Sequence, residues 1–271
     1  MKSVKNKSIT QPHDAIIARL QLSAREQDLV TLAFMEVKKF ADKTKVKLSQ
    51  FDPNQPENLN DIPTICTFSE KSVASLLGVT VKALNIKNQD NGKTFLHNVC
   101  RKLISRRTET NVNDGTFLVA NLLSEAECSH GVLRLEVTRS QAARMLDYGL
   151  NRNNFTRIDA KLVLGFKSRY TKRIFELISR FKNAQDYSTT LGELYDMLGT
   201  SADDHADFSR FKRNVLDRPI AQIVKDSCGV WQIKEGKGYI IDSQQGKKVT
   251  ERIRITFKMK FHDPEQPKQS T

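Results

Sequence analysis

Phe68 to Val79 reads FSEKSVASLLGV, and Tyr187 to Thr200 reads YSTTLGELYDMLGT. Each stretch has an aromatic residue, a hydroxyl residue able to cap a helix, a short apolar helical pattern and a glycine suited to end that helix. The two stretches align when a two-residue difference in length is allowed. The chain therefore contains an internal repeat, and the structure around each copy decides the fold.

The first copy lies within a longer series of expected elements. Ser23 and Glu26 have the spacing of a capping box, and Leu29, Leu32, Ala33, Val37 and Phe40 follow at helical spacing. A strand over 64–68 and a helix over 70–77 come next, and a second helix is expected over 93–107. Two β segments then follow, 116–123 and 132–138, joined through Ser129-His130-Gly131, with a turn at Asn113-Asp114-Gly115 before the first. Helix, strand, helix, turn, basic helix and β-hairpin form the order of a winged helix.

The same order begins again near Phe166. A helix is expected over 168–181, and Thr190 with Glu193 forms a second capping box. A basic helical region follows, in which Asp217 and Pro219 could restart the helix because proline fits a first turn. Alternating strands over 231–233, 239–242 and 252–261 would form the second wing.

We therefore predict an α+β fold of two tandem winged-helix domains related by an internal pseudo-repeat. The expected boundaries are a disordered N-terminal tail over 1–13, a first domain over 14–160, a second domain over 161–261, and a disordered C-terminal tail over 262–271.

The charge points to a polyanionic partner. The net charge is +13, and residues 1–160 hold 23 Lys+Arg against 17 Asp+Glu, while residues 161–271 hold 21 against 14. Both halves are therefore basic, which indicates that a nucleic acid contacts both. A soluble protein with many surface lysines is the plainer alternative.

Several other classes have little support in the sequence. No apolar run approaches the roughly 20 residues of a membrane helix, and the N-terminus has no apolar export segment, so a cytoplasmic location and no membrane partner are expected. The four cysteines form no C-x-x-C pair, which favours reduced thiols over a disulfide framework or a zinc site. We expect no metal and no cofactor. The five histidines form no H-x-H pair of the kind a tyrosine-type nicking enzyme needs, so we also expect no enzymatic activity.

The candidate DNA-binding residues are the outward positions of the two expected recognition helices, because the second helix of a helix-turn-helix enters the major groove. Arginine suits bidentate readout of guanine, and lysine more often contacts phosphate. In the first half the candidates are His97, Asn98, Arg101, Lys102, Arg106 and Arg107, and in the second they are Arg210, Lys212, Arg213 and Arg218, with Asn214 beside them. The alternative is that these residues form ordinary solvated helix faces.

Three segments resemble a known family. LGFKSRYTKRIFELISRF (164–181), DFSRFKRNVLDRPIAQI (207–223) and NLLSEAECSHGVLRLEVT (121–138) are similar to segments of the Rep initiators of iteron plasmids. The resemblance covers the chain from about Asp14 to Lys260. Lys212 and Arg213 fall where the second recognition helix of this family is basic.

The resemblance implies a bacterial, nucleoid- or plasmid-associated initiator that binds directly repeated origin iterons as a monomer through two winged helices. It also implies opening of an adjacent A·T-rich region and recruitment of host initiator and helicase-loading proteins. As a dimer, joined through the first domain, such a protein represses its own gene at an inverted repeat. Three alternatives stay open: a winged-helix transcriptional regulator without an initiation role, a rolling-circle nickase, and a partner-binding winged helix with incidental basic faces.

Overall fold

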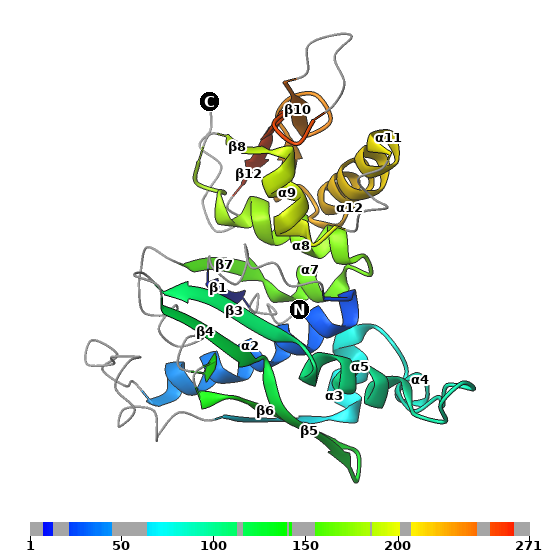
Figure 1. The fold of residues 1–271 in the computed structure, drawn as a ribbon. Coiled ribbons are helices and arrows are strands. Elements are labelled where there is room, and N and C mark those ends of the chain that lie inside the picture. Colours follow the sequence, from blue (N-terminus) through cyan, green and yellow to red (C-terminus); the bar gives the residue numbers. More distant parts are fainter. Residues whose placement is uncertain are drawn as a thin grey trace. The chain divides into compact units, whose positions relative to one another are not determined.

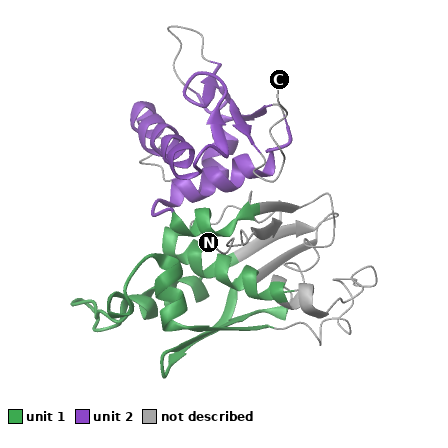
Figure 2. Cartoon of the chain, turned by 180° about the vertical axis from the view of Figure 1, so that it is seen from behind, with its two compact units in different colours: residues 1–165 green, residues 166–271 purple. Residues whose placement is uncertain are grey.

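The structure is a computed structural model of the 271-residue chain. It describes residues 8–12, 22–44, 64–112, 116–139, 141–142, 155–184, 186–200, 207–242 and 250–262. The chain divides into two compact units, residues 1–165 and 166–271 (Figure 2). The division falls five residues after the boundary expected from the sequence.

Unit 1 mixes helices and short antiparallel sheets (Figure 1). Its elements are β1 (Ser8–Pro12), α2 (Ala24–Thr44), β2 (Ile65–Ser69), α3 (Glu70–Leu77), α4 (Val81–Leu84), α5 (Phe95–Ile104), β3 (Arg107–Val112), β4 (Thr116–Asn121), β5 (Leu123–Ser129), β6 (Val132–Val137), β7 (Phe155–Asp159) and α7 (Ala160–Gly165). Strand β1 pairs with β7, β3 pairs with β4, and the three-stranded sheet has the order β2-β6-β5.

The predicted helix ends of unit 1 are confirmed by their hydrogen bonds. At the start of α2, the Ser23 N–H donates to Glu26 Oε2 at 2.6 Å and the Glu26 N–H donates to Ser23 Oγ at 3.3 Å. Ser69 caps α3 by accepting from the Ser72 N–H, and Gly78 ends that helix at φ +61°. Each cap satisfies a backbone group that would otherwise lack a partner, so these short helices have fixed ends.

The sheet β2-β6-β5 covers the core of unit 1 with one face. Leu133, Leu135 and Val137 alternate with outward residues along β6 and are each 1% exposed or less. Cys66 on β2 lies over α2, where its Sγ donates to the Ala33 carbonyl at 3.8 Å. The turn between β5 and β6 has positive φ at both His130 and Gly131. This hairpin is the wing that the sequence placed at Ser129-His130-Gly131.

Four details of unit 1 differ from the sequence expectation. Residues 8–12 form a strand paired with β7, so this part of the expected tail is ordered by backbone hydrogen bonds. The helix expected over 93–107 is shorter, because Thr94 caps it and residue 107 begins β3. The segment expected as one strand over 116–123 is divided at Leu122, whose N–H donates to the Arg106 carbonyl at 3.1 Å. Its first part pairs with β3, and β5 is the strand that pairs with β6. The predicted turn at 113–115 lies outside the described residues.

Unit 2 repeats the arrangement with fewer elements (Figure 1). They are α8 (Arg169–Arg180), β8 (Tyr187–Thr190), α9 (Leu191–Leu198), α11 (Phe208–Phe211), the π-helical segment η3 (Lys212–Asp217), α12 (Arg218–Asp226), β9 (Trp231–Ile233), β10 (Tyr239–Ile241), β11 (Arg254–Phe257) and β12 (Met259–Phe261). Strand β11 lies between β10 and β8, and β12 pairs with β9. Edge-to-face aromatic contacts fill its core, with ring centroids of Phe166 and Phe175 5.4 Å apart and those of Phe175 and Trp231 6.5 Å apart.

The two units share a topology. In each, the strand before the eight-residue helix pairs with the central strand of a three-stranded sheet, β6 in unit 1 and β11 in unit 2. The caps Ser69 and Thr190 and the glycines Gly78 and Gly199 are each 121 positions apart. The two-residue length difference in the sequence alignment therefore disappears, and Phe68 corresponds to Thr189 and not to Tyr187.

Each unit also contains an arginine that contacts the C-terminal end of its own eight-residue helix. In unit 1, Arg25 Nη1 on α2 donates to the Leu77 carbonyl at the end of α3 at 2.8 Å and lies 3.3 Å from Asp28 Oδ2. In unit 2, Arg173 on α8 donates to the Met197 carbonyl near the end of α9 at 2.7 Å and lies 3.0 Å from Glu176 Oε2. A cation suits a helix C-terminus, where carbonyls lack intrahelical partners. We call this contact the arginine clamp.

The sequence suggested that the basic helix of unit 2 restarts at Asp217, but the structure shows no restart there. The helix continues from Phe208 to Asp226 through η3. Pro219 has no N–H and its ring would clash with a carbonyl one turn earlier in an α-helix. The wider π turn immediately before it accommodates the proline without ending the helix.

At the C-terminal end, His262 was expected in a disordered tail but its N–H donates to the Val230 carbonyl at 2.8 Å. The rest of that expected tail, 263–271, lies outside the described residues. No helix among the described residues is long and apolar enough to cross a membrane.

Candidate nucleic-acid interface

The outward face of α5 carries the first group of candidates. Leu96, Val99, Cys100 and Leu103 are buried on its inner face. His97, Arg101 and Lys102 are exposed, and within the described part of the chain their side chains have no hydrogen-bond or ion-pair partner. They are therefore free to contact another molecule.

The structure places the other three candidates of unit 1 differently. Asn98 is half-buried and donates to the Lys93 carbonyl at 3.4 Å. Arg106 follows α5, and its Nε lies 3.4 Å from Glu26 Oε1, a carboxylate on a residue only 1% exposed. This pair compensates a buried charge, which gives Arg106 a structural role. Arg107 is exposed but opens β3, so it does not lie on the helix.

The second group lies on the long helix of unit 2. Phe211, Val215, Ile220 and Ile223 are all 1% exposed or less and face the core. Arg210, Arg213 and Arg218 are exposed and have no side-chain partner among the residues described, whereas Lys212 is half-buried. The sequence thus identified three unpaired guanidinium groups on one helix.

Asp217 connects this helix to the wing. The Tyr239 hydroxyl on β10 donates to Asp217 Oδ1 at 2.7 Å, and Lys237 Nζ lies 3.2 Å from Asp217 Oδ2. Burial, followed by the bond to Asp217, raises the pKa of the Tyr239 hydroxyl, so it stays a donor at neutral pH. Gly238 lies between wing and helix at φ +87°, where an added Cβ would be 2.7 Å from Met259 Sδ and 2.8 Å from Ile220 Cγ2. The wing is therefore closely packed on the helix.

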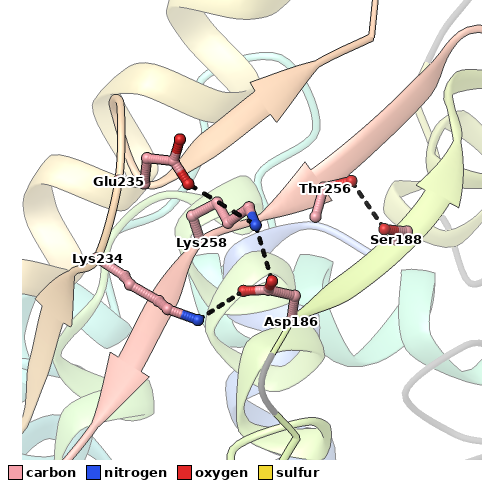
Figure 3. Close-up of polar contacts among 6 residues, drawn as sticks. All are labelled: Asp186, Ser188, Lys234, Glu235, Thr256 and Lys258. Carbon is pink, nitrogen blue, oxygen red and sulfur yellow. Dashed lines mark hydrogen bonds and ion pairs between the residues drawn. The ribbon is translucent and has the colours of Figure 1, made fainter.

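The second wing also carries lysines that the sequence analysis did not select (Figure 3). Asp186 accepts from Lys258 at 2.7 Å and from Lys234 at 3.2 Å, and Lys258 lies 3.7 Å from Glu235. The bonds from Lys258 and Lys234 lower the pKa of Asp186, and the bond to Asp186 raises that of Lys258. Beside this cluster the Ser188 and Thr256 hydroxyls are 2.7 Å apart (Figure 3). The pairing of β8 with β11 and that of β9 with β12 bring these segments together, so spacing along the sequence gave no signal.

The first wing has the opposite charge. Glu125, Glu127 and Glu136 lie on β5 and β6, and Arg134 is the cation among them. Its guanidinium is 2.7 Å from Glu125 Oε1 and 2.9 Å from Glu136 Oε2. This wing is therefore acidic, although the sequence predicted DNA binding by both domains.

No group of metal-ligating side chains occurs among the described residues. The four cysteines are free: Cys66 and Cys100 are buried, and Cys128 and Cys228 are exposed. Burial raises the pKa of the Cys66 and Cys100 thiols to about 12, so both stay protonated at neutral pH. These two thiols behave as small apolar core groups.

Comparison with known proteins identifies the family. The family model for the WH1 part of initiator replication proteins matches residues 8–179, more than half of the chain. The chain therefore belongs to the initiator replication protein family, as the sequence resemblance indicated. This is a family of DNA-binding replication initiators and not an enzyme family.

A solved structure shares the fold over nearly the full length. It is described as the Pi initiator protein in complex with iteron DNA, with a TM-score of 0.64 and 17% identity. The match covers 96% of this chain and 99% of that chain. A search of curated proteins gives no match.

Proposed function

We propose that this chain is a plasmid replication initiator that binds origin iterons as a monomer through two tandem winged-helix domains. One observation carries the proposal. Helices in corresponding places of the two units present unpaired cations, Arg101 and Lys102 on α5 and Arg210, Arg213 and Arg218 on the long helix of unit 2. Elsewhere, Arg134, Arg173 and Lys258 are paired with carboxylates.

Unpaired cations on a recognition helix favour DNA because their charge is not already compensated within the protein. If the five cations meet phosphates, the logarithm of the binding constant falls with the logarithm of salt concentration with a slope of about −4 to −5, at about 0.9 for each contact. Two reading helices on one chain also suit a site about two helical turns long. The iteron complex of the structurally similar Pi protein supports the same ligand class.

The binding experiment starts from the full chain and a pool of random duplexes about four helical turns long. The enriched sequence is then titrated by fluorescence anisotropy at salt concentrations from about 50 to 200 mM. We expect enrichment of one sequence and a steep salt slope. A flat slope would refute DNA binding through these cations.

We further propose that the protein opens an adjacent A·T-rich region, recruits host initiator and helicase-loading proteins, and as a dimer represses its own gene at an inverted repeat. Family membership supports these roles. Supplying the gene in trans to a plasmid that carries the origin but no initiator tests them. Replication of that plasmid supports initiation, and binding without replication favours a transcriptional regulator.

A further inference from the structure

The connection between α4 and α5 is an ordered hairpin and not a simple turn. In residues 85–94, Lys87 bridges to Thr94, the Asn88 N–H donates to the Lys93 carbonyl at 2.8 Å, and the Gly92 N–H donates to the Asn88 carbonyl at 2.9 Å. Side chains complete it: Asn88 accepts from the Asp90 N–H at 2.8 Å and Asn91 accepts from the Lys93 N–H at 3.0 Å. Its shape is therefore set within the chain, so binding through it costs little ordering entropy. We call residues 85–94 the turn hairpin.

A pair of amides fastens the turn hairpin to the recognition helix. Asn91 Nδ2 donates to Asn98 Oδ1 at 3.0 Å, and Asn98 Nδ2 donates back to Asn91 Oδ1 at 3.5 Å and to the Lys93 carbonyl at 3.4 Å. Asn98 lies in the first turns of α5. Its amide is engaged with the hairpin, so it acts as a positioning residue, although the sequence analysis selected it as a DNA-binding candidate.

The turn hairpin displays groups that suit a phosphodiester backbone. Lys87 is exposed, Lys93 is half-exposed and Gln89 adds an exposed amide donor, against one exposed carboxylate, Asp90. Among the residues that the structure describes, neither lysine has an ion-pair partner. The base-reading end of a recognition helix is its N-terminal end, so a hairpin fastened there lies beside the groove that α5 would enter.

The wing of the same unit lacks these properties. Its strands hold three glutamates, and two of them compensate Arg134. An acidic wing repels phosphates, whereas the wing of unit 2 is rich in lysine. The two units thus differ in which element beside the recognition helix is cationic.

We propose that in unit 1 the turn hairpin, and not the β5–β6 wing, contacts the DNA backbone beside the base pairs that α5 reads. The inference rests on the proposed function, since it requires that α5 binds duplex DNA. In this proposal Lys87 and Lys93 bind phosphates of the DNA backbone, and Asn98 holds the hairpin that carries these two lysines in place.

The test uses the full chain and the duplex enriched from the random pool. Lys87→Gln with Lys93→Gln removes two charges and keeps polar side chains. The matched control is Lys161→Gln with Lys167→Gln, two exposed lysines outside the hairpin. We expect the hairpin variant to reduce the salt slope by about 1.8, at about 0.9 per contact, and the control to leave it unchanged. Hydroxyl-radical footprints should lose protection at one end of the site only.

Asn98→Ala separates positioning from charge. It keeps both lysines but releases the hairpin, so we expect the same footprint positions to weaken while the thermal midpoint stays close to that of the wild type. An unchanged salt slope and an intact footprint in the double-lysine variant would overturn the inference. If the wild type itself fails to bind the duplex, the proposed function fails instead, so the two failures are distinguishable.

Discussion

Gly238 provides a test of how closely the second wing is packed on the long helix of unit 2. Gly238 and Gly229 have nearly the same backbone, at φ +87° and +91°, but an added Cβ at Gly229 meets nothing within 4 Å. Substituting alanine therefore imposes a similar backbone cost at both, of about 1–3 kcal/mol. Only at Gly238 must the Cβ also displace Met259 and Ile220.

The difference in stability between the two variants therefore measures the cost of displacing Met259 and Ile220. Overpacking typically costs about 1–3 kcal/mol, and each kcal/mol lowers the melting temperature of a domain of this size by roughly 4–8 °C. We therefore expect Gly238→Ala to melt roughly 4–24 °C below Gly229→Ala. The wing would also shift on the helix, so DNA affinity should fall in Gly238→Ala and stay near that of the wild type in Gly229→Ala.

The assay is thermal unfolding of the full chain followed by tryptophan fluorescence. Trp231 is the single tryptophan of the sequence, lies on β9 and is 3% exposed, so its emission reports unit 2 alone. Equal melting temperatures for the two alanine variants would refute the close contact between wing and helix.

Further expectations concern the long helix of unit 2, the arginine clamp and the second capping box. Arg213→Ala should weaken binding to the enriched duplex by about 1–3 kcal/mol and to random DNA by less; equal losses on both would make Arg213 a phosphate contact. Arg173→Met leaves the Glu176 carboxylate buried without this partner, so chemical denaturation of unit 2 should show a loss of about 3 kcal/mol, and a loss below about 1 kcal/mol would contradict a structural clamp. Bonds from the Thr190 N–H and from the Thr189 and Thr190 hydroxyls lower the pKa of Glu193, so its contribution is present above the ordinary carboxyl range and disappears as pH falls through the lowered pKa. Glu193→Gln keeps the capping geometry, and its stability relative to the wild type should rise as pH falls; a difference independent of pH would show that the carboxylate charge does not matter.

Local signals predicted the caps and the helix faces well. Ser69, Thr190 and the glycines that end α3 and α9 act through bonds within a few residues, so their roles can be read from spacing. The unpaired arginines of the second helix were found for the same reason, because helical periodicity alone separates them from the buried apolar residues.

Contacts between segments far apart in the sequence determine the features that local sequence patterns did not predict. Arg106 lies in a basic run, but its partner Glu26 comes from α2, 80 positions away. Asn98 has the periodicity of an outward residue, yet its amide is hydrogen-bonded to the turn hairpin. The β3–β4 hairpin interrupts the winged-helix order, and alternation of residues could not say whether β4 or β5 pairs with β6.

The π-helical segment in the long helix of unit 2 has a consequence for how the protein can change. A π turn holds one residue more than an α turn, so the arginine before it and the arginine after it are offset by about a quarter of a turn relative to a regular helix. Loss of one codon within residues 212–217 would restore regular winding and leave Arg210 and Arg218 in their present relative orientation, because the π turn already absorbs the extra residue. The π-helical segment is therefore a position where the helix can gain or lose one residue while the arginines on either side keep their orientation.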